Sequence, residues 1–210
     1  MDIVSLGTPF GLAFASGLNA YLPLLALAVS VRWLHLFKAN PSFSFITQIW
    51  FIVALVILTI LDFVADKIPL IEHVWNAIHT VVRPIAGALV AAAAGIHAIS
   101  GTHITDASSD AASRTVIAAS ILPITEVGLL IIFLLIGGVL AALSHTTKSI
   151  TRFVSTITTA GFLNIPLSFL EDVLVFIAIL LSLFVPAIML ALLVLFVLIV
   201  APRLMRIWNR

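Results

Sequence analysis

The stretch from Val173 to Ala201 contains no charged residue, and Pro186 divides it. Its 29 residues would make a single helix about 43 Å long, against a bilayer core of about 30 Å, so two helices that meet at Pro186 fit better. The chain is 62% hydrophobic and 9% charged, whereas a soluble domain carries about 25% charged residues. Helices satisfy their own backbone hydrogen bonds in lipid. The sequence therefore predicts an all-α, polytopic membrane protein embedded in the lipid bilayer.

The apolar runs predict about six transmembrane helices, at residues 5–31, 46–64, 84–100, 127–143, 167–185 and 187–203. Pro84 suits the first position of the third of them. Two more segments, 71–82 and 144–159, have the periodicity of amphipathic helices that lie in the interface or line a polar cavity. We expect one integral-membrane domain over residues 1–210, with 101–125 as an inserted loop and short helix.

The first predicted span contains a signal for irregular structure. Pro23 has no amide hydrogen to donate to the carbonyl of Asn19, which predicts a kink. Two interpretations stay open: a packed, kinked helix, or a broken helix that lines a site. Small residues recur every four positions in the first and third spans, which allows close helix packing within the chain or a homo-oligomer: Gly7, Gly11, Ala15, Gly87, Ala91 and Gly95.

Charged residues gather at one predicted level of the membrane. Asp62 and Asp66, four residues apart on one helical face, end the second span. The fifth span reaches membrane length only if it begins near Leu167, which places Glu171 and Asp172 one to two turns inside. The predicted site is inward-facing, and its residues are Asn19, Asp62, Asp66, Arg83, His145, Lys148, Arg152, Glu171 and Asp172. The alternative is that these side chains sit at ordinary helix ends among lipid headgroups.

The arginines of the C-terminal tail predict a cytoplasmic C-terminus, and six crossings then place the N-terminus on the same side. Residues 59–62 (TILD) are similar to 168–171 (SFLE). The segments 1–100 and 126–210 could therefore form an inverted repeat of two three-helix halves, a pattern of many transporters.

Some functions are disfavoured by composition. A net charge of +1 argues against nucleic acid as a partner, and the lack of cysteine rules out disulfides and thiolate metal sites. Spacings typical of metal ligands or of catalytic motifs, such as His-Glu-x-x-His or Gly-x-Ser-x-Gly, are absent from the sequence. We therefore predict no metal or catalytic residues, and the cofactor stays unknown.

Several short motifs resemble an uncharacterised bacterial integral-membrane family known only as a conserved domain of unknown function. They are GLNAYLPL at 17–24, DFVADKIP at 62–69, RPIAGA at 83–88, His-x-x-Lys-x-x-x-Arg at 145–152 and Leu-Glu-Asp at 170–172. Asp62 stands where the family pattern has glutamate. The resemblance implies a bacterial inner-membrane protein and groups these motifs into one site, but it implies no activity.

Three functions are compatible with such a site. The leading hypothesis is a small transporter or channel-like protein, because intramembrane acids paired with bases suit coupling to a proton, cation or small solute. The second is a membrane-embedded enzyme that acts on a lipid or isoprenoid substrate. The third is an assembly or scaffold protein whose charges only orient its own helices.

Overall fold

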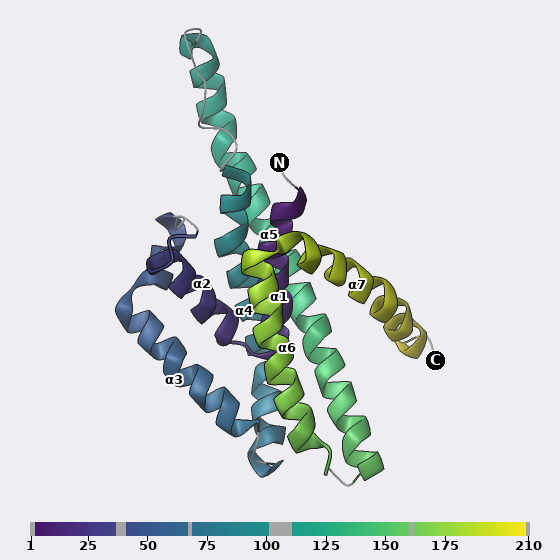
Figure 1. Ribbon diagram of the computed structural model, residues 1–210. Coiled ribbons are helices and arrows are strands. Elements are labelled where there is room, and N and C mark those ends of the chain that lie inside the picture. The colour runs from purple at the N-terminus through teal and green to yellow at the C-terminus, as the bar shows by residue number, and fades with distance from the viewer. Residues whose placement is uncertain (1–2, 37–40, 67–68, 101–110, 160–161, 209–210) are drawn as a thin grey trace.

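The computed structural model describes residues 3–36, 41–66, 69–100, 111–159 and 162–208 (Figure 1). All regular structure in these residues is helical. The elements are two 3-10 helices, η1 (Ile3–Leu6) and η2 (Pro41–Thr47), and the α-helices α1 (Gly7–Leu18), α2 (Leu22–Arg32), α3 (Ile49–Ala65), α4 (Pro69–Ser100), α5 (Ala111–Thr159), α6 (Asn164–Phe184) and α7 (Pro186–Trp208).

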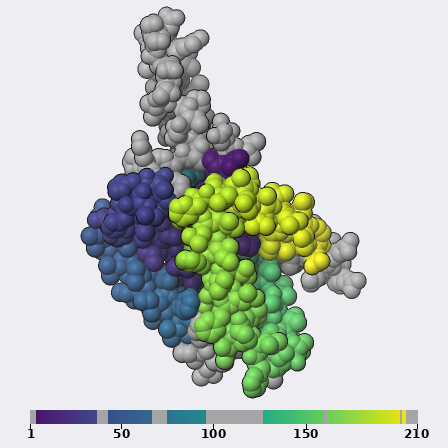
Figure 2. All heavy atoms as spheres, in the orientation of Figure 1, coloured from purple at the N-terminus to yellow at the C-terminus, as the bar shows by residue number. Residues whose placement is uncertain are grey.

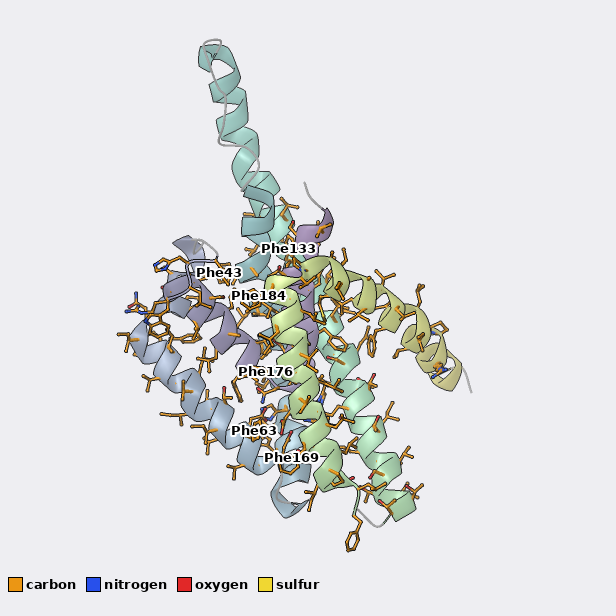
Figure 3. The ribbon with its side chains drawn as sticks, in the orientation of Figure 1. Phe43, Phe63, Phe133, Phe169, Phe176 and Phe184 are labelled. Carbon is orange, nitrogen blue, oxygen red and sulfur yellow. The ribbon has the colours of Figure 1, made fainter. Side chains whose placement is uncertain are left out.

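Three segments of the described helices are long and apolar enough to cross a membrane: Trp75–Gly95, Val127–Thr159 and Asn164–Phe184. Their outer faces are apolar as well. Phe169, Phe176 and Phe184 lie along α6 and expose 54%, 58% and 61% of their surface (Figure 3). Rings this exposed are costly in water and suited to lipid. Length, composition and surface together indicate a membrane protein.

Helix α1 forms the centre of the bundle, packed by α4, α5, α6 and α7, and the long α4 and α5 pair side by side (Figure 1). Small residues make these approaches possible. A Cβ added to Gly87 of α4 would lie 2.3 Å from the Cβ of Ala141, and one added to Gly137 of α5 would lie 2.6 Å from the Gly87 carbonyl oxygen. The predicted small-residue faces are therefore used inside the chain.

The sequence predicted the amphipathic segments as separate helices, and this prediction is wrong. Residues 71–82 and the third span are one helix, α4, with Pro84 in its interior. A break inside an apolar bundle would leave several backbone groups without partners, whereas an internal proline removes one hydrogen bond. Likewise α5 continues from the fourth span through 144–159, and it already begins at Ala111. The rest of the predicted insertion, 101–110, lies outside the described residues.

The first predicted span is also corrected. Helix α1 ends at Leu18, and Asn19 has extended backbone angles (φ −137°, ψ 120°). The Asn19 side-chain Oδ1 accepts hydrogen bonds from the amides of Tyr21 (3.1 Å) and Leu22 (2.9 Å), so Asn19 ends one helix and caps the next. Pro23 fits because the first turn of α2 needs no amide donor there. In Figure 1, α1 runs down into the bundle and α2 runs back up.

At the other end of the chain the predicted break is confirmed: α6 ends at Phe184 and α7 begins at Pro186. Helix α6 begins at Asn164, so Glu171 lies about two turns inside it. Figure 2 shows α6 running down the face of the molecule, with α3 on one side and α5 and α7 on the other. This arrangement turns one face of α6 towards α1 and α5.

Candidate functional site

Seven of the nine predicted site residues come together between α1, α3, α4, α5 and α6. None of the seven exposes more than 7% of its surface. They comprise three acids, three bases and one imidazole, here called the charged network: Asp62, Asp66, Glu171, Arg83, Lys148, Arg152 and His145. Formal charges of three acids and three bases cancel, which is the condition for burying so many ions together.

One half of the network has short contacts. Lys148 Nζ lies 2.6 Å from Asp66 Oδ2 and 3.2 Å from Glu171 Oε2. Arg152 binds Glu171 through two atoms, with Nε 3.3 Å from Oε1 and Nη2 2.5 Å from Oε2. Bidentate pairing of this kind is among the strongest side-chain hydrogen bonding. These four residues tie α5 to the end of α3 and to α6.

Asp66 directly follows α3, outside the membrane-spanning segments, where the negative end of the helix dipole disfavours an acid. Burial raises the pKa of its carboxyl group, but the charges of Lys148, Arg152 and Arg83 lower it by more. The pKa of Asp66 is therefore below its ordinary value of 3.8. Asp66 stays ionised at physiological pH and acts as a fixed anion.

The other half, around Asp62, has longer contacts. Arg83 Nη2 lies 3.6 Å from Asp62 Oδ1 and 3.9 Å from Asp66 Oδ1, beyond normal hydrogen-bond distance. Trp75 Nε1 donates to Asp62 Oδ1 at 2.7 Å. Asp62 Oδ2 is buried and has no hydrogen-bond partner among the described residues. This carboxylate is thus held on one oxygen and keeps free lone pairs on the other.

His79 was not among the predicted site residues, yet it faces this carboxylate. Its Nδ1 lies 2.9 Å from the backbone oxygen of Trp75, which can only accept, so Nδ1 carries a hydrogen. Its Nε2 lies 3.5 Å from Asp62 Oδ1. In the neutral ring, Nε2 and Oδ1 turn lone pairs towards each other; a second proton makes Nε2 a donor to the carboxylate. Asp62 and His79 therefore form a place where one proton can be shared.

A second histidine has the opposite arrangement. Arg83 Nη1 donates to His145 Nδ1 at 3.1 Å, and because an arginine cannot accept, Nδ1 must be unprotonated. The ring is then neutral, with its hydrogen on Nε2, 3.4 Å from Thr80 Oγ1. The Thr80 hydroxyl donates to the Asn76 carbonyl at 3.0 Å and is free to accept. Arg83 thus lies between the acids on one side and His145 on the other.

The broken end of α1 completes the network with backbone oxygens. Lys148 Nζ donates to the Leu18 carbonyl at 3.1 Å, and Arg83 Nη1 reaches the Gly17 carbonyl at 3.4 Å. Helix C-termini carry partial negative charge and unpaired carbonyls, so cations belong there. The buried Asn19 side chain uses its oxygen to cap α2. Asp172 is half-buried, about 100° around α6 from Glu171.

The sequence held a signal for the missed residues. Trp75, His79 and Arg83 follow one another at intervals of four on α4, and the rings of Trp75 and His79 lie 4.9 Å apart. Tyr21, just beyond the α1 break, stands edge-on to His79 with ring centroids 5.6 Å apart. The polar face of residues 71–82 therefore already pointed to His79, once Arg83 was assigned to the site.

Comparisons with known proteins agree with the resemblance seen in the motifs. A family model described as Domain of unknown function (DUF4126) matches residues 6–206, nearly the whole chain. No curated protein and no solved structure matches this chain. The matched range contains the broken α1, the α3 acids, the α4 and α5 bases and Glu171. The chain belongs to the DUF4126 family, a domain of unknown function.

Proposed function

We propose that this protein is a small membrane transporter that couples the movement of a solute to a proton, with the charged network and His79 as its coupling site. One observation carries the proposal. His79 Nε2 faces Asp62 Oδ1 at 3.5 Å while its Nδ1 hydrogen is engaged by Trp75, so the pair gains an ionic hydrogen bond when it takes up one proton. Intramembrane acids and histidines are typical of proton relays.

Arg83 supplies the link from the proton to a change in conformation. Without the extra proton, the Asp62 carboxylate attracts the Arg83 guanidinium, 3.6 Å away. With it, the His79 imidazolium competes for the same carboxylate, and Arg83 is attracted instead towards Asp66, 3.9 Å away, and His145. Because Arg83 also contacts the Gly17 carbonyl, a shift of its side chain moves the end of α1. The solute site would open and close with this movement.

The contact distances differ between the two halves of the network, and this difference supports a mobile Arg83 beside a rigid set of ion pairs. Asp66, Lys148, Arg152 and Glu171 hold three helices at hydrogen-bond distances, whereas the contacts of Arg83 with the acids exceed 3.5 Å. A network that served only to orient helices would be expected to have short contacts throughout. Buried ion pairs also give little net stability compared with apolar packing, so stability alone does not explain six buried charges.

The fold suggests a membrane topology that differs from the six predicted crossings. We propose that Val4–Arg32 is a re-entrant hairpin whose tip, around Asn19, meets the charged network, and that α3 to α7 cross the bilayer. Irregular backbone at membrane depth is tolerated where protein buries it. The C-terminal tail with its arginines stays on the cytoplasmic side of a bacterial inner membrane, and the N-terminus moves to the opposite side. The predicted inverted repeat of two three-helix halves is an alternative to this topology, because it needs three crossings in residues 1–100.

This topology has a direct test, because the chain has no native cysteine. Val4 and Trp33 are both exposed, at either end of the hairpin. Single cysteines at these two positions should react with a membrane-impermeant maleimide from the same side of sealed vesicles. Reaction from opposite sides would show that 5–31 crosses the membrane once.

The function is tested by proton flux into liposomes. Purified protein is reconstituted with a trapped pH-sensitive dye, a potassium diffusion potential is imposed, and a panel of ions and small solutes is supplied. Wild-type protein should carry protons in a solute-dependent manner, and Asp62→Asn and His79→Asn should reduce the rate at least about tenfold. His35→Asn is the matched control: His35 is exposed, and its positive φ of 51° suits asparagine.

The scaffold hypothesis gives the opposite result. Exchange of the longer pair, Asp62→Arg with Arg83→Asp, keeps the summed charge and should retain folding. A scaffold would keep its cellular function after this exchange, and no solute in the panel would drive protons through the wild-type protein. A transporter would lose coupled flux, because the carboxylate that faces His79 has been removed from α3.

A further inference from the structure

A groove of about 410 Å³ opens beside the charged network, between α1, α5, α6 and α7. Its volume lies in the range of small-molecule sites in proteins. Most of its wall is apolar, including Leu181, Met189 and Phe196, and its rim is formed by side chains that are about half exposed: Leu170, Leu174, Ile177 and Leu192. In Figures 1 and 2, α7 leaves the end of α6 and diverges, with the lower part of α5 beside α6. On a membrane protein this rim faces lipid.

The length of the groove fits one lipid chain. Along α6 its lining extends from Leu167 to Leu181, 14 residues apart, which is about 21 Å at helical rise. One leaflet contributes about half of the ~30 Å hydrocarbon core. The groove is therefore long enough to hold a hydrocarbon chain from the headgroup level to the middle of the bilayer.

One end of the groove is polar, with charges of both signs. Lys148 and Glu171 line it there, 3.2 Å apart. Thr147 and Thr151 line it as well, and each donates its hydroxyl hydrogen to the carbonyl four residues before, so that the oxygen lone pairs remain as acceptors. This end offers carboxylate and hydroxyl acceptors to an ammonium group, whereas the three hydrogens of the Lys148 ammonium are already directed at Asp66, Glu171 and the Leu18 carbonyl.

We propose that this groove binds a zwitterionic membrane lipid of the phosphatidylethanolamine type, with one acyl chain along α6 and the headgroup at Lys148 and Glu171. The headgroup is zwitterionic because the positive charge of Lys148 is already balanced by Asp66 and Glu171, which leaves no surplus to favour an anionic lipid. The groove shares Lys148 and Glu171 with the charged network, but lipid binding there does not require the Asp62–His79 pair to exchange a proton.

The test is photolabelling in phosphatidylcholine liposomes with phosphatidylethanolamine that carries a diazirine on its acyl chain, followed by mass-spectrometric mapping. Label should concentrate on groove-lining residues of α6 and α7, and unlabelled phosphatidylethanolamine should compete better than phosphatidylglycerol. Even labelling of the exposed face of α3, at Ile60 and Leu61 for example, would show ordinary annular lipid and overturn the proposal. Equal or better competition by phosphatidylglycerol would overturn the headgroup assignment.

Two pairs of variants sharpen the test. Leu174 lines the groove and Val173, its neighbour, does not, although both are about half exposed. Leu174→Trp should reduce labelling roughly tenfold, and Val173→Trp should leave it unchanged. If Leu174→Trp does not fold, Thr151→Val removes one acceptor at constant volume and should weaken competition by phosphatidylethanolamine, with exposed Thr146→Val as its control. Identical behaviour within either folded pair would refute the site.

Discussion

Replacement of Lys148 by methionine tests the energetics of the charged network. The Lys148 ammonium lies 2.6 Å from Asp66 Oδ2, 3.2 Å from Glu171 Oε2 and 3.1 Å from the Leu18 carbonyl oxygen. Its side chain is 2% exposed, so water cannot take its place on the acids. Removal of one partner from a buried ion pair costs about 3–5 kcal/mol, because the remaining charge stays buried. This is roughly a hundredfold to several-thousandfold change in the folding equilibrium.

The assay is reversible unfolding in mixed lipid–detergent micelles, followed by the fluorescence of the four tryptophans. Lys148→Met should lower the free energy of unfolding by about 3–5 kcal/mol. Addition of Glu171→Gln should recover at least about 1 kcal/mol, because it removes the surplus negative charge. Thr146→Ala, on the exposed side of α5, should change stability by less than about 0.5 kcal/mol. Equal losses in Lys148→Met and Thr146→Ala, or strict additivity of the two network substitutions, would refute the reasoning.

Three further predictions concern the helix break, the packing and the fixed anion. Asn19→Ala should lower the free energy of unfolding by about 0.5–2 kcal/mol through loss of the α2 cap, and Asn19→Asp should keep most of it; equal losses would contradict the capping role. Gly137→Ala should lower the thermal midpoint by several degrees because its Cβ would lie 2.6 Å from the Gly87 oxygen, whereas Gly128→Ala, in open space, should not. Because its pKa is lowered on folding, the stability that Asp66 contributes is complete above the ordinary value of 3.8 and is lost as the pH falls below it. The drop in stability between about pH 6 and pH 3 should therefore be smaller in Asp66→Asn than in wild type.

The helical class and the separation of α6 from α7 could be predicted, because both depend on local properties. Uncharged apolar runs have to be helical in lipid, and Pro186 is a local breaker. The approach of Asp62, Asp66 and Glu171 was predicted from span length, since a carboxylate one to two turns inside an apolar helix must face a polar interior. The structure brings those three acids into contact with the bases of α4 and α5.

Helix boundaries were harder to predict, because neighbouring helices decide them. Pro84 suits a helix start, yet α4 runs through it. Asn19 and Pro23 suited either a kink or a break, and the two hydrogen bonds to Asn19 Oδ1 are compatible only with the break. His79 was missed because the sequence does not show which residue the polar face of its helix contacts; the fold places Asp62 3.5 Å from it.

The central claim, that Asp62 and His79 share an exchangeable proton, can be measured most directly by nitrogen-15 NMR of His79 in lipid nanodiscs. Its Nδ1 should be protonated throughout, and Nε2 should gain a proton as the pH is lowered over the range in which the protein stays folded, with a titration that is altered in Asp62→Asn. The His145 signal serves as the internal reference, since Arg83 holds its Nδ1 unprotonated. A His79 ring that stays in one protonation state across this range, or titrates identically in Asp62→Asn, would contradict the account.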